Sequence, residues 1–228
     1  RTRTASSSYM SFVTETPDVG EVGFDRVNRL KFRESAWCGA PGDCYDPAAA
    51  AITTLFFIQK EGSGDDGTIL DADVELNGVN FAISSGGQSN ALGKPLSDLS
   101  NTFTHEAGHI LGLDHTCWDG RGTPPIDDVG NPVPLCSTQG LPPEITEATM
   151  YPYQDEGETK KATLEQDDID GVCAIYPLAE DPGTCAPAAG PSGCCSVVSG
   201  RAARRGAPSA LAVLLAVGVG VFALRRRR

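Results

Sequence analysis

The side chains with the most evident chemistry lie in one segment, Thr104 to Thr116, which reads T-H-E-A-G-H-I-L-G-L-D-H-T. The segment holds all three histidines of the 228-residue chain: His105, His109 and His115. Imidazole is a common metal ligand, and histidines scattered through a core or a surface would not gather within eleven residues. The segment therefore predicts a single metal site.

The spacing of these residues indicates the kind of site. His105 and His109 are four residues apart, so on a helix they project from one face, and Glu106 can reach the open position of an ion that they bind. Gly112 can then turn the chain out of the helix, because glycine adopts positive φ without steric penalty, and His115 can return as a third ligand. Structural zinc sites are usually closed by four protein ligands. Three imidazoles therefore predict one catalytic Zn²⁺, with Glu106 as general base.

Two predicted helices and two predicted strands must position this segment. Ser97 or Asp98 can cap the first helix, whose core face would consist of Leu99, Phe103, Ile110 and Leu111. Thr163 opens the second helix, Gln166 completes a capping box, and Pro177 ends it.

The strands lie earlier in the chain. The run from Ala51 to Ile58 is β-branched and aromatic, which predicts a buried strand. In residues 70–77 apolar and acidic or amide side chains alternate, which predicts a half-buried strand with one wet, acidic face. Residues 27–32 are a candidate for a further short strand.

The full H-E-x-x-H-x-x-G-x-x-H pattern resembles the zinc signature of the metzincin metalloendopeptidases, and within that clan the matrixins. The stretch Ala148 to Pro152, A-T-M-Y-P, resembles the family's Met-turn, and Leu164 to Tyr176 resembles its C-terminal helix. The resemblance implies an α+β zincin-like fold, in which a twisted mixed sheet accompanies an active-site helix and a C-terminal helix. It also implies an endopeptidase of protein or peptide substrates, in which Glu106 takes a proton from zinc-activated water.

The resemblance assigns further site residues. Met150 would form an apolar floor under the histidines, and Tyr151, Pro152 and Tyr153 would form a wall of the substrate pocket. The sequence departs from the family at Gln154, where an aromatic residue is expected. It also departs in the 34 residues between the third histidine and the Met-turn, 116–149, which form a long insertion beside the expected cleft.

Four aspartates could bind Ca²⁺, as matrixin domains do: Asp65, Asp66, Asp71 and Asp73. Carboxylate oxygens are suitable ligands for this ion, but no loop of EF-hand spacing is present. The alternative is an ordinary acidic strand face in an acidic protein.

Composition divides the chain into five stretches: a leader or truncated element at 1–20, the matrixin-like domain at 21–178, a Pro/Gly/Ala linker at 179–207, an apolar segment at 208–224 and an arginine cluster at 225–228. The family resemblance is strong from about residue 99 to 177 and thin before that. We therefore expect the domain to be N-terminally incomplete.

The apolar segment 208–224 predicts a C-terminal transmembrane helix. As a helix it would span about 26 Å at about 1.5 Å per residue, which is just enough for a thin hydrocarbon core. The arginines after it would stay cytoplasmic, which predicts a membrane-anchored, extracellular catalytic domain. Cys194 and Cys195, followed by this span and the arginines, resemble the sorting tails of myxobacterial surface proteins (MYXO-CTERM type), which implies cleavage near the cysteines. A disulfide between the two cysteines is the alternative.

Charge and cysteine content narrow the setting. All 30 acidic residues lie at or before Asp181, whereas seven of the 18 basic residues follow it, so the body is more negative than the net −12 of the whole chain. Such a body repels nucleic acid, and we expect a secreted or cell-surface monomer. Eight cysteines without a C-x-x-C pair favour an oxidising compartment over a cysteine zinc site. Sequence neighbours suggest three bridges: Cys38–Cys44, Cys117–Cys136 and Cys173–Cys185.

Two other functions remain open at this point. One is a surface binding module that keeps zinc for structure and has lost turnover. The other is a zinc hydrolase that acts on a non-peptide bond with the same ligands. Glu106 argues against the first, because an inactive module would have no need of the base.

Overall fold

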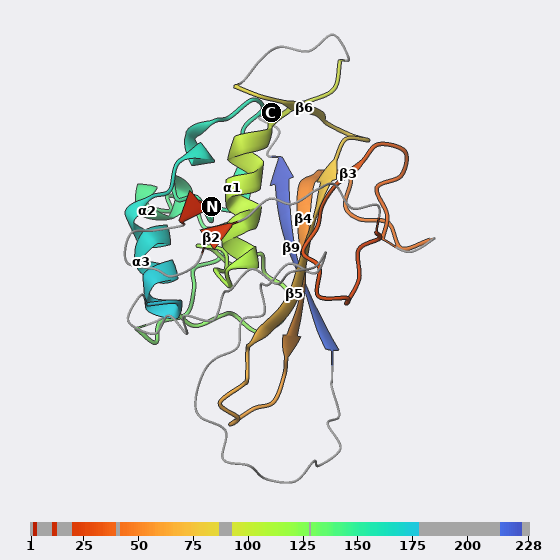
Figure 1. Cartoon of the computed structure of the whole chain (residues 1–228). Helices are drawn as coiled ribbons and strands as arrows, with labels where there is room; N and C mark the ends of the chain where they lie inside the picture. The colour runs from red at the N-terminus through yellow and green to blue at the C-terminus, as the bar shows by residue number, and fades with distance from the viewer. Residues whose placement is uncertain are drawn as a thin grey trace.

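The computed structural model describes residues 20–39, 42–86, 93–127 and 129–177 in full, and residues 2–3, 11–12 and 215–224 by their backbone. They form a mixed α+β fold, which confirms the predicted class. A five-stranded sheet lies at its centre, and helices α1, α2 and α3 lie on one side of that sheet (Figure 1).

The central sheet has the strand order β3-β5-β4-β9-β8. Its strands are β3 (Leu30–Arg33), β4 (Ala49–Ile58), β5 (Ile69–Asn77), β9 (Leu215–Leu224) and β8 (Tyr153–Gln154). β3 is parallel to β5, β4 is antiparallel to β5 and β9, and β8 is parallel to β9. Two small sheets accompany it: antiparallel β1 (Thr2–Arg3) with β2 (Ser11–Phe12), and parallel β6 (Ala82–Ser84) with β7 (Leu96–Asp98).

Strands β4 and β5 confirm the two predicted strands, but the acidic face of β5 is not wet. Asp71, Asp73 and Glu75 are at most 1% exposed. The preceding chain folds over them and uses them as hydrogen-bond acceptors. Asp71 Oδ2 accepts the N–H groups of Asp25 and Arg26, at 2.7 and 2.6 Å. Alternation alone could not reveal this cover, because it comes from a segment more than 40 residues away.

The apolar C-terminal segment also differs from its prediction. Residues 215–224 form strand β9, so the helix predicted over 208–224 is wrong for the part that the structure describes. The physical reason is the alternation of Val217, Val219 and Val221 with glycines, since β-branched residues and glycine are poor helix formers. The free edges of β4 and β8 supply backbone partners on both sides. Among the described residues, no helix has the length and apolar character needed to cross a membrane.

Helix α1 (Leu99–Ile110) starts at the predicted Asp98, whose side chain accepts the N–H of Asn101. Of the four residues predicted for its apolar core face, Leu111, at the end of the helix, is buried in an apolar cluster, but the other three are not. Leu99, Phe103 and Ile110 are only partly buried, whereas the fully buried residues are Asn101, Thr102, His105, Glu106, Gly108 and His109. The helix therefore buries mainly polar side chains, including Glu106 and two of the histidines.

Three further helical segments follow: α2 (Pro143–Thr146), the 3₁₀ helix η1 (Lys160–Ala162) and α3 (Gln166–Ile175). The capping box of α3 pairs Glu165 with Asp168, so the predicted start at Thr163 is wrong. The residues just before it are already in the η1 turn. Leu111, Val172 and Tyr176 form an apolar cluster between the end of α1 and α3.

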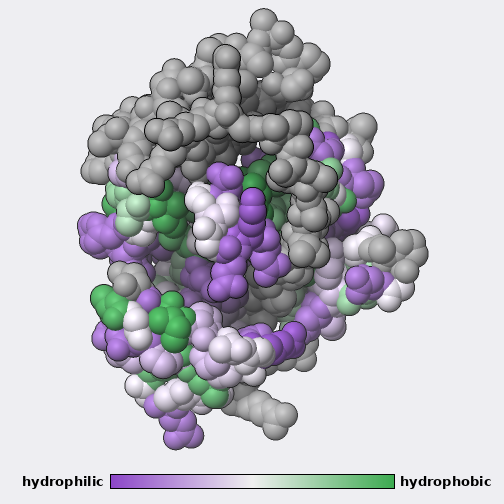
Figure 2. All heavy atoms as spheres, turned by 90° about the horizontal axis from the view of Figure 1, so that it is seen from below, coloured by the Kyte–Doolittle hydropathy of each residue, from purple (hydrophilic) through white to green (hydrophobic). Residues whose placement is uncertain are grey.

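Two predicted disulfides are confirmed, Cys38–Cys44 and Cys117–Cys136. They indicate an oxidising, extracellular environment. The proposed partner of Cys173, Cys185, lies outside the described residues. Seen from below, hydrophilic residues cover much of the described surface, with smaller hydrophobic groups between them (Figure 2), as expected for a chain of net charge −12.

Candidate metal centre

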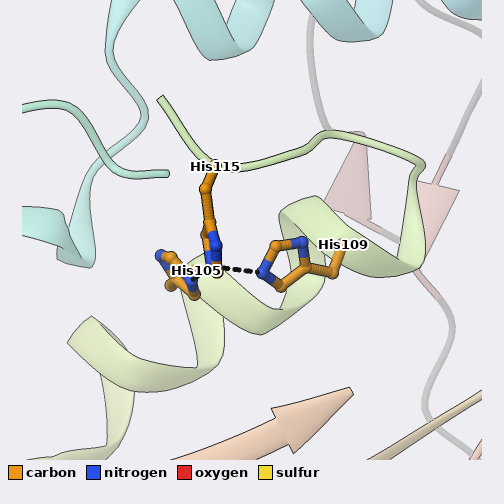
Figure 3. A group of neighbouring side chains, drawn as sticks. All are labelled: His105, His109 and His115. Atoms are coloured by element: carbon orange, nitrogen blue, oxygen red, sulfur yellow. Dashed lines mark hydrogen bonds between the residues drawn. The ribbon is translucent and has the colours of Figure 1, made fainter. Parts of the chain in front are cut away.

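The three histidines come together from two elements. His105 and His109 lie on one face of α1, and His115 lies on the loop that follows it (Figure 3). Gly112, at φ 88°, makes the turn out of the helix, as the sequence predicted. His115 Nε2 lies 3.2 Å from His105 Nε2 and 3.1 Å from His109 Nε2. Among the described residues this is the one group of three or more histidine, cysteine or acidic side chains able to hold a metal ion.

Backbone carbonyls orient the two helical histidines. His105 Nδ1 donates to the carbonyl oxygen of Thr149 at 2.7 Å, and His109 Nδ1 donates to that of Leu113 at 2.8 Å. Because a carbonyl oxygen can only accept, the proton of each neutral ring lies on Nδ1 and the Nε2 lone pair is free. This arrangement is typical of histidines that bind metal through Nε2.

The cluster calls for a cation. His105 and His109 both present an Nε2 lone pair to His115 Nε2, which can donate at most one proton. At least one pair of nitrogens would then meet lone pair to lone pair at about 3 Å, unless a positive ion lies between them. Tetrahedral Zn²⁺ with Zn–N distances of about 2.0–2.1 Å separates its nitrogens by roughly 3.3 Å, close to the observed spacing. The residues present therefore fit such an ion.

Burial keeps these rings neutral. It lowers the pKa of His109, lowers the pKa of His105 well below its usual range, and lowers the pKa of His115 to about 3. Neighbouring histidines and Lys161 add to the effect at His105 and His115. At neutral pH the three rings are therefore not protonated to imidazolium, and they are in the neutral form that binds metal.

Glu106 is completely buried beside the histidines. Thr53 of β4 donates its hydroxyl to Glu106 Oε2 at 2.5 Å, whereas Glu106 Oε1 is buried without a hydrogen-bond partner. Burial raises the pKa of Glu106 to about 8, and the Thr53 hydrogen bond opposes this. A cation at the histidines would further favour the charged carboxylate. Thr53 therefore holds one oxygen of Glu106, and the other oxygen has no hydrogen-bond partner.

Met150 packs against α1, the helix that carries His105 and His109. It lies in a turn closed by the Tyr151 N–H and the Ala148 carbonyl at 3.1 Å, and it is 3% exposed. A Cβ at position 108 would overlap the Met150 sulfur, so glycine at this position makes room for the Met150 side chain against α1. The floor role under the histidines that the family resemblance implies stays a prediction.

The predicted wall residues follow this turn. Tyr151 and Pro152 are buried and Tyr153 is half-buried, and the two tyrosine rings meet edge to face at 5.5 Å between centroids. Gln154, where the family would place an aromatic residue, is 2% exposed and accepts a hydrogen bond from Asn101 of α1 at 2.7 Å. Gln154 therefore ties the segment that follows Met150 to α1.

The insertion is joined to the site at its start. Thr116 donates its N–H to the Met150 carbonyl at 3.2 Å and its hydroxyl to the Ile145 carbonyl at 2.9 Å. The Cys117–Cys136 disulfide then closes the first part of the insertion. The loop that carries His115 is thus fixed against the Met-turn.

The predicted calcium ligands are not assembled into a site. Asp65 and Asp66 lie in the exposed turn between β4 and β5, where Asp66 accepts the Lys60 N–H at 2.7 Å. Asp71 and Asp73 are buried, and their oxygens are taken by backbone N–H groups. The predicted cleavage motif, Cys194 and Cys195, lies outside the described residues.

Sequence reasoning missed Thr53 and Lys161. In the sequence Thr53 is one residue of a predicted buried strand, and the one available signal is that a hydroxyl inside an apolar run needs a partner. The carbonyls of Thr149 and Leu113 have no side-chain signature that a sequence could show.

No protein-family model, no curated protein and no solved structure matches this chain.

Proposed function

We propose that the protein is a zinc-dependent endopeptidase that acts outside the cell. The observation that carries this proposal is the convergence of three neutral imidazole nitrogens next to a buried carboxylate with one unpartnered oxygen. A purely structural zinc site is usually closed by four protein ligands and needs no base. The unpartnered oxygen of Glu106 therefore favours catalysis over a binding module.

His105, His109 and His115 would hold the ion. A bound zinc ion supplies Lewis acidity, which lowers the pKa of water towards about 7 and polarises a carbonyl group. Glu106 takes the proton of the attacking water on Oε1 and returns it to the departing amine. Thr53 holds the other oxygen of Glu106, so that the carboxylate does not rotate away from the reacting atoms.

A polypeptide substrate is supported by the resemblance of the zinc segment and the Met-turn to those of matrixins. The two disulfides support action in an oxidising environment outside the cell. Extracellular proteins are therefore the proposed substrates.

The test is hydrolysis of a mixed peptide library by the zinc-loaded chain, with Glu106→Gln and a chelator-treated sample as controls. We expect cleavage by the parent protein alone and the loss of cleavage in both controls. Absence of cleavage at one bound zinc per chain would overturn the peptidase proposal in favour of a binding module or a hydrolase of another bond.

A further inference from the structure

Lys161 is a buried cation that the proposed reaction does not use. It is 1% exposed and heads the largest fully buried side chains of the described residues. A lysine is almost never fully buried unless its ammonium has partners. Burial lowers the pKa of Lys161 to about 7, so the fold bears a cost to keep this side chain inside.

The partners of Lys161 lie on the segment that follows Met150. Its Nζ donates to the carbonyls of Tyr151 and Tyr153, at 2.7 and 2.5 Å. It also lies 5.5 Å from the centre of the Tyr151 ring and 3.8 Å from Glu158 Oε1. The ammonium therefore holds two alternate carbonyls of one extended segment.

The backbone of Lys161 connects this segment to α1. The Lys161 N–H donates to Asn101 Oδ1 at 2.7 Å, and the same Asn101 side chain donates to Gln154 Oε1 at 2.7 Å. Asn101 lies one helical turn before His105 on α1. Lys161 thus bridges the helix that carries two metal ligands and the segment that starts at the Met-turn.

The Met-turn is where the bridge reaches the metal centre. The carbonyl of Thr149, two residues before Tyr151, accepts the Nδ1–H of His105 at 2.7 Å. It lies on the segment that Lys161 holds at the carbonyls of Tyr151 and Tyr153. Partners that orient a ligand in this way typically contribute about 10- to 100-fold to metal affinity.

We propose that Lys161 is a positioning residue of the metal centre, which locks the segment 149–154 to α1 and so holds the Thr149 carbonyl that orients His105. The proposal rests on the metal centre of the proposed function and not on its peptidase activity. It predicts that replacing Lys161 changes metal affinity in the direction opposite to the change expected from removing its charge alone. Loss of an ammonium near a dication would strengthen metal binding, whereas loss of a positioning contact weakens it.

The experiment compares the full chain with Lys161→Met and with Lys160→Met. Lys160 is a matched control, because it is the adjacent lysine and its ammonium is partly exposed in ion pairs with Glu147 and Glu158. Zinc affinity is measured by competition with a chelator, and the Co²⁺-substituted protein is examined by visible absorption. Amide hydrogen exchange is followed in segment 149–154 and in α3.

For Lys161→Met we expect zinc affinity to fall about tenfold or more, the Co²⁺ bands to shift, and exchange to accelerate in 149–154 but not in α3. Lys160→Met should match the parent in all three. If Lys161→Met does not fold, Lys161→Gln takes its place. Its shorter, neutral amide weakens the hold on the two carbonyls without removing every donor, so zinc affinity should fall in the same direction but by less. Unchanged or tighter metal binding would overturn the proposal, as would exchange that accelerates equally in α3. Failure of peptide cleavage in the parent would bear on the peptidase proposal alone.

Discussion

The protein buries carboxylates in two regions that differ in how completely their oxygens are satisfied. On β5, both oxygens of Asp71 accept backbone N–H groups, from Asp25 and Arg26 at one oxygen and from Ala72 at the other. On α1, Glu106 is equally buried, but only Oε2 has a partner, Thr53, and Oε1 has none. We call the region on β5 the closed region, because both oxygens of Asp71 have partners. In the region on α1, one oxygen of Glu106 has no partner.

The difference teaches how to separate structural from chemical carboxylates. A buried polar atom without a partner costs free energy, so each one needs an explanation. Among the described acidic residues with such an oxygen, Glu106, Glu158 and Asp168, only Glu106 lies on the helix that carries two of the histidines. Asp71 organises the loop before β3, including Arg26, the one non-glycine residue of the described chain with positive φ, at 68°. Glu106 organises nothing with its second oxygen. We therefore assign Asp71 to the fold, and the contrast supports the proposal that Glu106 acts in the reaction.

The largest effect should come from exchanging each region's buried glutamate for its amide. Glu106→Gln should lower peptide cleavage by roughly 10³-fold while zinc stays at one per chain, because general-base catalysis contributes about 10²–10⁴-fold. Glu75→Gln on β5, where the carboxylate pairs with Arg33 and Tyr45, should lower stability and leave turnover per bound zinc unchanged. Equal losses of turnover in the two variants would remove the distinction between the regions.

The second effect concerns the closed region. Asp71→Ala removes a charged acceptor from the Asp25 and Arg26 N–H groups, so it should lower the free energy of unfolding by about 2 kcal/mol. Asp65→Ala, at an exposed turn, should change it by less than about 0.5 kcal/mol. Denaturant titration gives both values. A neutral Asp71→Ala would show that the loop does not depend on this carboxylate.

The third effect concerns the anchored oxygen of Glu106. Thr53→Val keeps the shape of the side chain and removes the hydroxyl, so turnover per bound zinc should fall about tenfold, the equivalent of one hydrogen bond of about 1.4 kcal/mol. Thr53→Ser should restore most of it. Thr54→Val, on the opposite face of β4 by strand alternation, is the matched control and should leave turnover unchanged.

The smallest effect tests the strain that Asp71 holds in place. Arg26→Gly should stabilise the protein by about 0.5 kcal/mol, because glycine adopts positive φ without the steric cost that other residues bear. Arg26→Ala removes the same side chain and keeps the strain, so it should give no gain. Thermal unfolding of the two variants separates them, and a gain in both would assign the effect to the side chain instead.

Local rules explain which parts of the fold and of the candidate site were predictable. The histidine spacing, the turn at Gly112 and the cap at Asp98 each depend on residues within one or two helical turns, so they can be read from the chain. The strands β4 and β5 follow from residue type, and two of the disulfides join close sequence neighbours. These parts of the structure agree with their predictions.

The remaining features depend on contacts between distant segments. The acidic residues of β5 alternate as a wet face would, but the chain before β3 covers them. The segment 215–224 is apolar enough for a membrane helix, yet it pairs with two open strand edges. By itself, the sequence determined which side chains could bind a metal and how they are spaced along α1 and the loop after it. The tertiary structure decided which carboxylates have partners, which carbonyls orient the histidines, and where Lys161 lies, because hydrogen bonds between distant residues leave no periodic pattern in a chain.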